Sequence, residues 1–429
     1  MARGANVQQR DSEGAWASAL SLARQPGWDI TTLRIDGRTA LYAPDPDTFG
    51  GADALKYAAT VDDCLAVRMK VLILNSYGPD PANVSWRTLD YEGATTQWDL
   101  YTWKYGSYAS TGIGKFLAVM PRGATSARWA GLSRVYLHMI STAVAKCNAR
   151  GLDPATYIEV QIGNEPDFNT TDVNTTGDHF YSAPENFKDW FAYIVPIIYA
   201  YCHPLGIKIV GPAFITSPSV LTTLPTTTTH PYYPLHPTTG NIDYEVMLAA
   251  TLGDASFLAA MALCDKFAIH LYCNASGIWG MGKSQIADWY LKAAHSMAAS
   301  LDTRFGYKPK YVTEVGITYS RAGMTTHGRQ KNQSYRGKIL QKIISRLENS
   351  GLFEKVFVYQ LLNASAGEDA TGDYFAAGKS DGTWTAAGAE FARESGTPIA
   401  DATVLAETGS AWVVESGESQ PATTAPSEV

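Results

Sequence analysis

Two glutamates in this 429-residue chain each stand at the end of a short β-rich run. Glu165 follows the run at 157–162 in the segment YIEVQIGNEP, and Glu314 interrupts the run at 310–319, KYVTEVGITY. At the carboxyl ends of parallel strands, polar side chains commonly serve catalysis. A pair of carboxyls can divide the work of proton donor and negatively charged partner. The two side chains are therefore our first candidates for acid–base chemistry.

The spacing of the two glutamates predicts how the chain is organised around them. The roughly 150 residues between them leave room for three further strand–helix units, each of about 30 residues or more with insertions. This spacing is what a (β/α)8 barrel with carboxylates on its fourth and seventh strands requires.

The motifs around these glutamates carry a resemblance to a known group of enzymes. NEP at 164–166 and TEVG at 313–316 resemble clan A of the glycoside hydrolases, whose (β/α)8 barrels carry the acid/base on strand four and the nucleophile on strand seven. The resemblance extends over residues 1–395, without a particular family. It implies that Glu165 is the acid/base and Glu314 the nucleophile of a retaining glycosidase, with carboxyls roughly 5 to 5.5 Å apart.

The resemblance also implies roles for residues on neighbouring strands. Arg34, at the end of ITTLRID, matches the arginine that hydrogen-bonds the nucleophile; an ordinary surface arginine is the competing interpretation. Asn164 matches the residue that bonds the sugar 2-hydroxyl. His270 and Tyr272 match the strand-six pair that bonds the nucleophile and lines the subsite of the cleaved sugar. A histidine there can also be an ordinary, satisfied core residue.

The eighth strand departs from the pattern of the clan. Clan A usually has a tryptophan at the end of this strand, whereas Tyr359 and Gln360 occupy the place here. We expect Gln360 to contact substrate, and Trp384 in the next loop is the alternative source of an aromatic floor. The resemblance implies no metal and no organic cofactor.

The fold class expected is α/β, a (β/α)8 TIM barrel with long loop insertions on the catalytic face. The barrel is expected over 1–400 and a C-terminal extension over 401–429, disordered from about 416 because it is polar and of low complexity. A proline kink or break is expected at Pro196 in the helix over 187–206. The expected strands are 4–9, 30–36, 70–78, 157–162, 206–214, 266–274, 310–319 and 356–365.

Composition favours a neutral polymer as the partner. The net charge is −7 and the pI about 5.6, which argues against a nucleic-acid partner. Aromatic residues are 11% of the chain and charged residues only 17%, and sugars stack their apolar faces on aromatic rings. An aromatic-rich insertion at 79–125 is expected to shape an extended cleft, or alternatively to form a small packed subdomain.

Other features bound the setting of the protein. Five scattered cysteines lack metal-ligand spacing and are expected to be buried free thiols. No apolar stretch suits a signal peptide or membrane insertion, so we expect a cytoplasmic or virion-associated protein, another export route, or a chain whose leader has been removed. The sequence does not set the oligomeric state.

These observations predict a retaining glycoside hydrolase that cleaves a β-linked poly- or oligosaccharide internally by double displacement. Two alternatives stay open. One is a non-catalytic carbohydrate-binding barrel of a virion or surface assembly, and the other is an exo-acting intracellular glycosidase on small oligosaccharides.

Overall fold

The protein folds as a closed barrel of eight parallel strands in sequential order. The computed structural model describes residues 2–8, 13–36, 49, 52–75, 126–165, 184–214, 254–273, 282–317, 333–361, 378–379, 383 and 385–395. The predicted (β/α)8 fold is confirmed. The strands are β1 (Ala2–Gln8), β2 (Ile30–Asp36), β3 (Lys70–Asn75), β4 (Ile158–Ile162), β5 (Lys208–Phe214), β6 (Lys266–Cys273), β7 (Lys310–Ile317) and β8 (Lys355–Val358).

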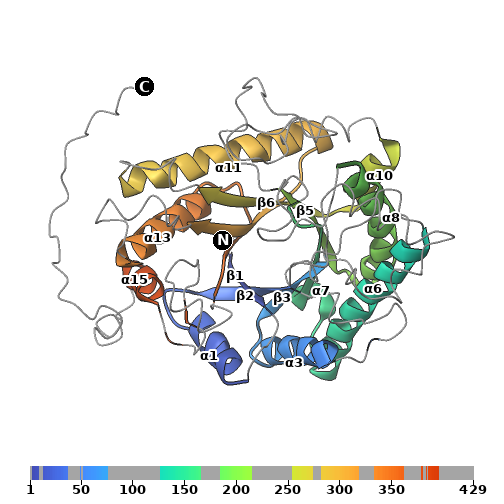
Figure 1. Ribbon diagram of the computed structural model, residues 1–429, viewed down its shortest axis with the longest axis horizontal. Helices are drawn as coiled ribbons and strands as arrows, with labels where there is room; N and C mark the ends of the chain where they lie inside the picture. Colours follow the sequence, from blue (N-terminus) through green and yellow to red (C-terminus); the bar gives the residue numbers. More distant parts are fainter. Residues whose placement is uncertain are drawn as a thin grey trace, which may run out of the picture.

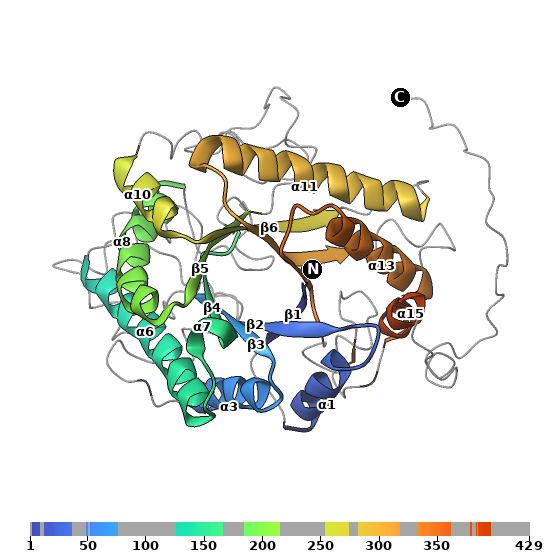
Figure 2. The same cartoon turned by 180° about the vertical axis from the view of Figure 1, so that it is seen from behind.

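Helices surround the barrel on its outer side, as Figure 1 shows, and Figure 2 shows the same ring from behind. None of the described helices is both long and apolar enough to cross a bilayer. The described helices are α1 (Glu13–Ala23), α3 (Ala52–Ala66), α6 (Ser126–Ala149), α7 (Pro154–Tyr157), α8 (Pro184–Cys202), α10 (Ala255–Leu263), α11 (Lys283–Phe305), α13 (Gln333–Asn349) and α15 (Ala386–Glu394), with a short 3-10 turn at His203–Leu205.

Alternation along each strand sorts side chains between the two faces of the barrel wall. On β3, Val71 and Ile73 join the large core cluster that includes helix side chains, whereas Leu72 belongs to a separate cluster inside the barrel. Such layers of inward side chains fill the interior of a (β/α)8 barrel. The interior apolar layer consists of Leu72, Val210, Ala213, Ala268, Tyr311 and Phe357.

Toward the amino ends of the strands, the barrel holds a cluster of three charged side chains and one tyrosine, buried except for the partly buried Lys266. We call it the floor cluster: Glu159, Lys266, Tyr311 and Lys355. Glu159 accepts hydrogen bonds from Lys266 at 3.0 Å, from Tyr311 at 2.5 Å and from Lys355. Burial raises the pKa of Glu159, but the ammonium groups of Lys355 and Lys266 outweigh burial and hold it below its usual value. The floor cluster therefore links β4, β6, β7 and β8 through one carboxylate.

All eight predicted strands are present, and their ends differ from the prediction to varying degrees. The second strand occupies the predicted residues 30–36, the first begins at Ala2 instead of residue 4, and the eighth ends at Val358 instead of continuing to 365. Of the two outcomes predicted at Pro196, a kink or a break, the break is wrong, because α8 continues through this residue from Pro184 to Cys202. The helix packs against α6 and α10.

Two short helices were not predicted. In α10 nearly every residue is apolar, so the sequence shows no helical period there. Its start is set by Asp254, whose carboxylate accepts from the Phe257 N–H at 2.8 Å and caps the helix. The helix α7 is a single turn that opens with Asp153 and Pro154.

Four of the five cysteines, Cys64, Cys147, Cys202 and Cys264, are free and buried as expected. The side chain of the fifth, Cys273, is outside the described part. The aromatic insertion at 79–125 and the C-terminal extension at 401–429 also lie outside the described residues.

Candidate active site

The chain turns sharply where β4 ends, and this turn sets the position of Glu165. Gly163 has a φ of 93° and Glu165 a φ of 46°, both in the left-handed region, which a side chain such as that of glutamate adopts only under constraint. Hydrogen bonds supply the constraint. The Gly163 N–H donates to the Asn75 carbonyl at 3.1 Å, and the Glu165 N–H donates to the Ala213 carbonyl at 2.8 Å.

A register shift between β6 and β7 positions Glu314. Ile269 pairs with Val312 but His270 pairs with Glu314, so Thr313 is an extra residue on β7. Such a bulge re-aims the side chain that follows it. Glu314 is consequently only 6% exposed and lies opposite His270 in the barrel.

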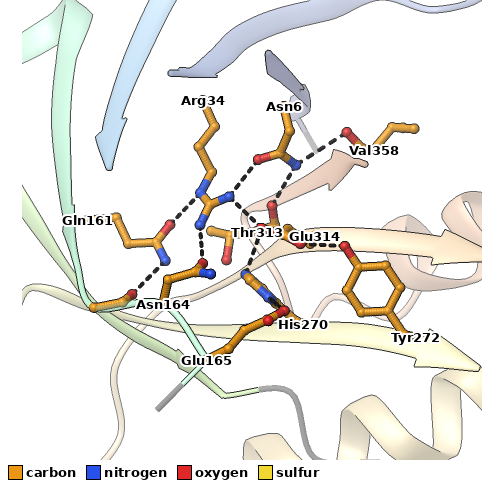
Figure 3. Close-up of polar contacts among 11 residues, drawn as sticks. Asn6, Arg34, Gln161, Asn164, Glu165, His270, Tyr272, Thr313, Glu314 and Val358 are labelled. Carbon is orange, nitrogen blue, oxygen red and sulfur yellow. Dashed lines mark hydrogen bonds and ion pairs between the residues drawn. The ribbon is translucent and has the colours of Figure 1, made fainter. Parts of the chain in front are cut away.

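Arg34 of β2 connects four side chains inside the barrel, as Figure 3 shows. Its Nη1 donates to Glu314 Oε1 at 2.6 Å and to Asn6 Oδ1 at 2.7 Å. Its Nη2 donates to Asn164 Oδ1 at 2.6 Å, and its Nε donates to Gln161 Oε1 at 2.8 Å. The planar guanidinium is therefore fixed on all its edges beside the Glu314 carboxylate.

His270 of β6 lies between the two carboxyls. Its Nδ1 is 2.7 Å from Glu165 Oε1, and its Nε2 is 3.5 Å from Glu314 Oε1. The ring has no exposed surface. Burial lowers the pKa of His270 to about 3, against the opposing effect of the Glu314 charge. The imidazole is therefore neutral near pH 7 and carries one ring proton.

Burial raises the pKa of Glu314 above its usual value, and the nearby Glu165 adds to this effect. His270, Arg34 and the hydrogen bond from Tyr272 act in the opposite direction and offset the effect of burial only in part. The Tyr272 hydroxyl donates to Glu314 Oε2. Burial and the nearby Glu314 charge raise the pKa of Tyr272 well above its usual value, so its hydroxyl keeps its proton as a donor.

Three buried groups of the site could in principle ligate a metal ion. Glu165, His270 and Glu314 each offer one ligand atom, and these atoms lie within 4.8 Å of one another. Each of the three groups already has a polar partner, because Arg34 and Tyr272 bond Glu314 while His270 contacts Glu165. The positive charge of the Arg34 guanidinium beside Glu314 opposes a cation at this place.

The structure brings most of the predicted site residues together. Gln360 lies just beyond β8 and is buried, but no hydrogen bond joins it to either glutamate in the described part of the chain. Trp384 lies outside the described residues. The residues that meet at the carboxyl ends of the strands are Arg34, Asn164, Glu165, His270, Tyr272 and Glu314.

Two members of the site were not predicted. Asn6 accepts from Arg34 and donates to the Thr313 carbonyl at 2.9 Å. Gln161 accepts from Arg34 and donates to the Gly163 carbonyl at 3.1 Å. The available signal was a polar residue between two apolar residues of a buried strand, since Gln161 stands between Val160 and Ile162.

Comparison with protein-family models gives no match, and comparison with curated protein sequences gives none either. Solved structures do match over most of the chain. A family 39 glycoside hydrolase from Bacteroides cellulosilyticus is similar with a TM-score of 0.52 and 12% identity. The match covers 91% of this chain and 62% of that protein, so this chain spans less than two thirds of its length.

Two GH5_18 structures give similar matches. One, from Streptomyces cattleya in complex with GlcNAc, has a TM-score of 0.52, 12% identity and coverage of 92% of this chain and 79% of that one. The other, a variant from Bifidobacterium longum in complex with Manb1-4GlcNAc, has a TM-score of 0.52, 12% identity and coverage of 92% and 78%. At these identities the likeness establishes the shared barrel fold alone.

Proposed function

We propose that this protein is a retaining glycoside hydrolase that cleaves a β-linked poly- or oligosaccharide by double displacement. The observation that carries the proposal is the pair of buried carboxyls at the ends of β4 and β7, with one oxygen of each within 4.8 Å of the other. An inverting enzyme leaves a wider gap of about 6.5–9.5 Å between its carboxyls, to admit water. The likeness in fold to glycoside hydrolases supports the same reaction class.

The contacts of each carboxyl support a division of roles. Glu314 accepts from Arg34 and Tyr272, which favour its charged form, as a nucleophile requires. Glu165 contacts the buried imidazole of His270, whose Nδ1 is 2.7 Å from Oε1. With Glu314 as the nucleophile, Glu165 is the acid that protonates the departing oxygen and the base that later activates water.

Asn164 has a donor left for substrate. Its Oδ1 accepts from Arg34, and no residue in the described part of the chain accepts from its amide nitrogen. We assign this N–H group to the sugar 2-hydroxyl, a contact that strengthens in the transition state.

Endo action is the further part of the proposal, and it rests on the aromatic-rich insertion at 79–125 as the wall of a long cleft.

The first test is hydrolysis of a panel of polysaccharides and aryl glycosides by the wild type, with product anomers followed by NMR. We expect retention of configuration, and losses of several orders of magnitude in Glu165→Gln and Glu314→Gln. Glu354→Gln, which changes a half-exposed glutamate at the opposite end of the barrel, is the matched control and should keep its rate. Net inversion would overturn the double displacement.

Azide distinguishes the two roles. In Glu314→Ala, azide can attack the sugar directly and yields the glycosyl azide of opposite anomeric configuration. In Glu165→Ala, azide attacks the glycosyl-enzyme and yields the azide of retained configuration. The reverse pattern would exchange the two assignments. Binding of a glycan without any turnover in the wild type would favour the non-catalytic barrel, and release of single sugars from chain ends would favour exo action.

A further inference from the structure

His270 lies between two carboxyls that the reaction requires in opposite protonation states. Its Nδ1 is at hydrogen-bond distance from Glu165, at 2.7 Å, and its Nε2 faces Glu314 at 3.5 Å. A neutral imidazole has one N–H donor and one acceptor nitrogen. The ring can therefore donate toward only one carboxyl at a time and must present a lone pair to the other.

The charge on Glu314 decides which nitrogen carries the proton. While Glu314 is ionised, a lone pair on Nε2 would face a negative oxygen, so the proton is favoured on Nε2. Nδ1 is then an acceptor, and the partner that suits an acceptor is the protonated, neutral carboxyl of Glu165. This arrangement is the one from which the general acid must start.

We propose that His270 is a positioning residue that couples the two carboxyls through its tautomer, with the ring proton on Nε2 while Glu314 is ionised and on Nδ1 once Glu314 is esterified. The inference deepens the proposed function and rests on it. It adds a device that sets the protonation of Glu165 according to the state of Glu314.

The proton balance closes over the two steps. In the first, the Glu165 proton passes to the leaving oxygen, and a Glu314 oxygen bonds the anomeric carbon. The ring then exchanges its Nε2 proton for one at Nδ1, and the water that enters in place of the leaving group both accepts the first proton and supplies the second. The ring stays neutral and now donates from Nδ1 to the Glu165 carboxylate. In the second, Glu165 takes a proton from the attacking water, the ester bond breaks, and the Glu314 carboxylate restores the first tautomer.

The surroundings of the ring restrict it to this exchange. The ionisable groups that face it in the described part of the chain are Arg34 from β2, Glu165 at the end of β4, Tyr272 beside it on β6, and Glu314 from β7. Arg34 opposes a second proton on the ring, and the absence of exposed surface opposes any charge there. The imidazole therefore changes tautomer without becoming a cation.

The test reads the tautomer directly and needs no substrate. In protein labelled with 15N-histidine, NMR distinguishes protonated from unprotonated ring nitrogens, and the His270 signals are assigned by their loss in His270→Asn. We expect the Nε2–H form in the wild type at neutral pH. In Glu314→Gln, where the nucleophile is uncharged as in the ester, we expect the Nδ1–H form.

Tyr272→Phe, measured at a pH above its acid limb, is the matched control, because it removes another contact of Glu314 while the carboxylate stays charged, so the Nε2–H form should persist. The same tautomer in wild type and Glu314→Gln, a switch in Tyr272→Phe, or a doubly protonated ring at neutral pH would each overturn the proposal. If hydrolysis proceeds with retention but the tautomer is the same in wild type and Glu314→Gln, the proposed coupling is wrong and the proposed function stands. If no hydrolysis is found, the proposed function fails, and the NMR result still decides whether the tautomer follows the charge of Glu314.

A second measurement uses the pH profile of kcat/KM. His270→Phe keeps the ring volume but removes both nitrogens, so the Glu165 proton loses its acceptor. We expect the basic limb to move to lower pH in this variant, whereas a purely structural histidine would lower the rate without moving the limb. His270→Asn, whose amide can turn either its oxygen or its nitrogen toward Glu165, should shift the basic limb less than His270→Phe does.

Discussion

At the scale of single residues, the site is a set of donors arranged around one carboxylate. Arg34 and Tyr272 both donate to Glu314, and these contacts oppose the effect of burial on its pKa. Removing one of them should therefore make the carboxylate harder to form. The consequence can be measured as a change in pH dependence, separately from any loss of stability.

For Tyr272→Phe we expect the acid limb of the kcat/KM profile to move to higher pH, because the hydrogen bond that lowers the pKa of Glu314 is lost. The matched control is Tyr290→Phe, which removes a buried hydroxyl outside the site. This hydroxyl, on α11, donates to the carbonyl of Gly316 at 2.7 Å, and Gly316 is on β7, the strand that carries Glu314. Its acid limb should stay in place. An unmoved limb in Tyr272→Phe would argue against Glu314 as the ionised nucleophile.

Gln161 joins Arg34 to the turn that carries Glu165, because it contacts the Arg34 Nε and the Gly163 carbonyl. For Gln161→Met, which keeps the length of the side chain, we expect kcat/KM to fall by about 10- to 100-fold, as for a small misplacement of a catalytic group. Gln161→Glu keeps the acceptor for Arg34 and should lose less. Equal losses in the two variants would show that the Arg34 contact is not what matters.

At the scale of elements, the helices around the barrel depend on close approach at specific points. Gly337 of α13 lies against α15, where an added Cβ would be 2.2 Å from the Ala387 carbonyl oxygen. A backbone atom cannot move aside as a flexible side chain can. The α13–α15 contact is thus set by the absence of a side chain at this position.

We expect Gly337→Ala to lower the free energy of unfolding by about 1–3 kcal/mol, the usual cost of overpacking. The sign is diagnostic, because glycine to alanine inside a helix otherwise stabilises by roughly 1 kcal/mol. Chemical denaturation measures the difference. A stabilised variant would mean that α15 can move away without cost.

The elements also explain how much of the structure the sequence predicts. Strands such as β2 and β7 are apolar runs bounded by turn residues, and the NEP and TEVG motifs identify Glu165 and Glu314 as candidate site residues from the sequence alone. Asn6 and Gln161 were missed because their partners come from other strands, and only the barrel register brings them to Arg34. The eighth strand was predicted too long because apolar residues continue past Val358 to Leu361.

At the scale of the whole molecule, closure of the barrel joins its first strand to its last and places charged groups inside. The floor cluster pairs one buried glutamate with two lysines, of which Lys355 is buried and Lys266 partly buried. A buried ion pair that loses one partner leaves an uncompensated charge, which is far more costly than the pair itself. The cluster therefore makes stability sensitive to Glu159.

For Glu159→Gln we expect a loss of about 3–5 kcal/mol in the free energy of unfolding. The double variant Glu159→Gln/Lys355→Met should recover part of this loss, since it also removes the lysine left unpaired. Denaturant titration of the wild type, both single variants and the double variant gives the coupling. Additive losses would argue that Glu159 and Lys355 do not depend on each other.

The pH dependence of stability follows from the same carboxylate. Because the folded-state pKa of Glu159 is depressed, its contribution is present above the unfolded-state pKa and is lost as pH falls through the folded-state pKa. We expect the wild type to lose this stabilisation below the ordinary range of glutamate, and Glu159→Gln to show a weaker dependence there. Denaturation midpoints measured across acid pH test this.

The apolar layer between the floor cluster and the candidate site has a consequence for protein engineering. On β6, Ala268 separates Lys266 from His270, and the two groups of charges share no hydrogen-bond partner among the described residues. Changes without shared partners tend to combine additively. Libraries at the floor could thus be screened for heat resistance alone, and the best variants joined afterwards to loop libraries selected for a new sugar.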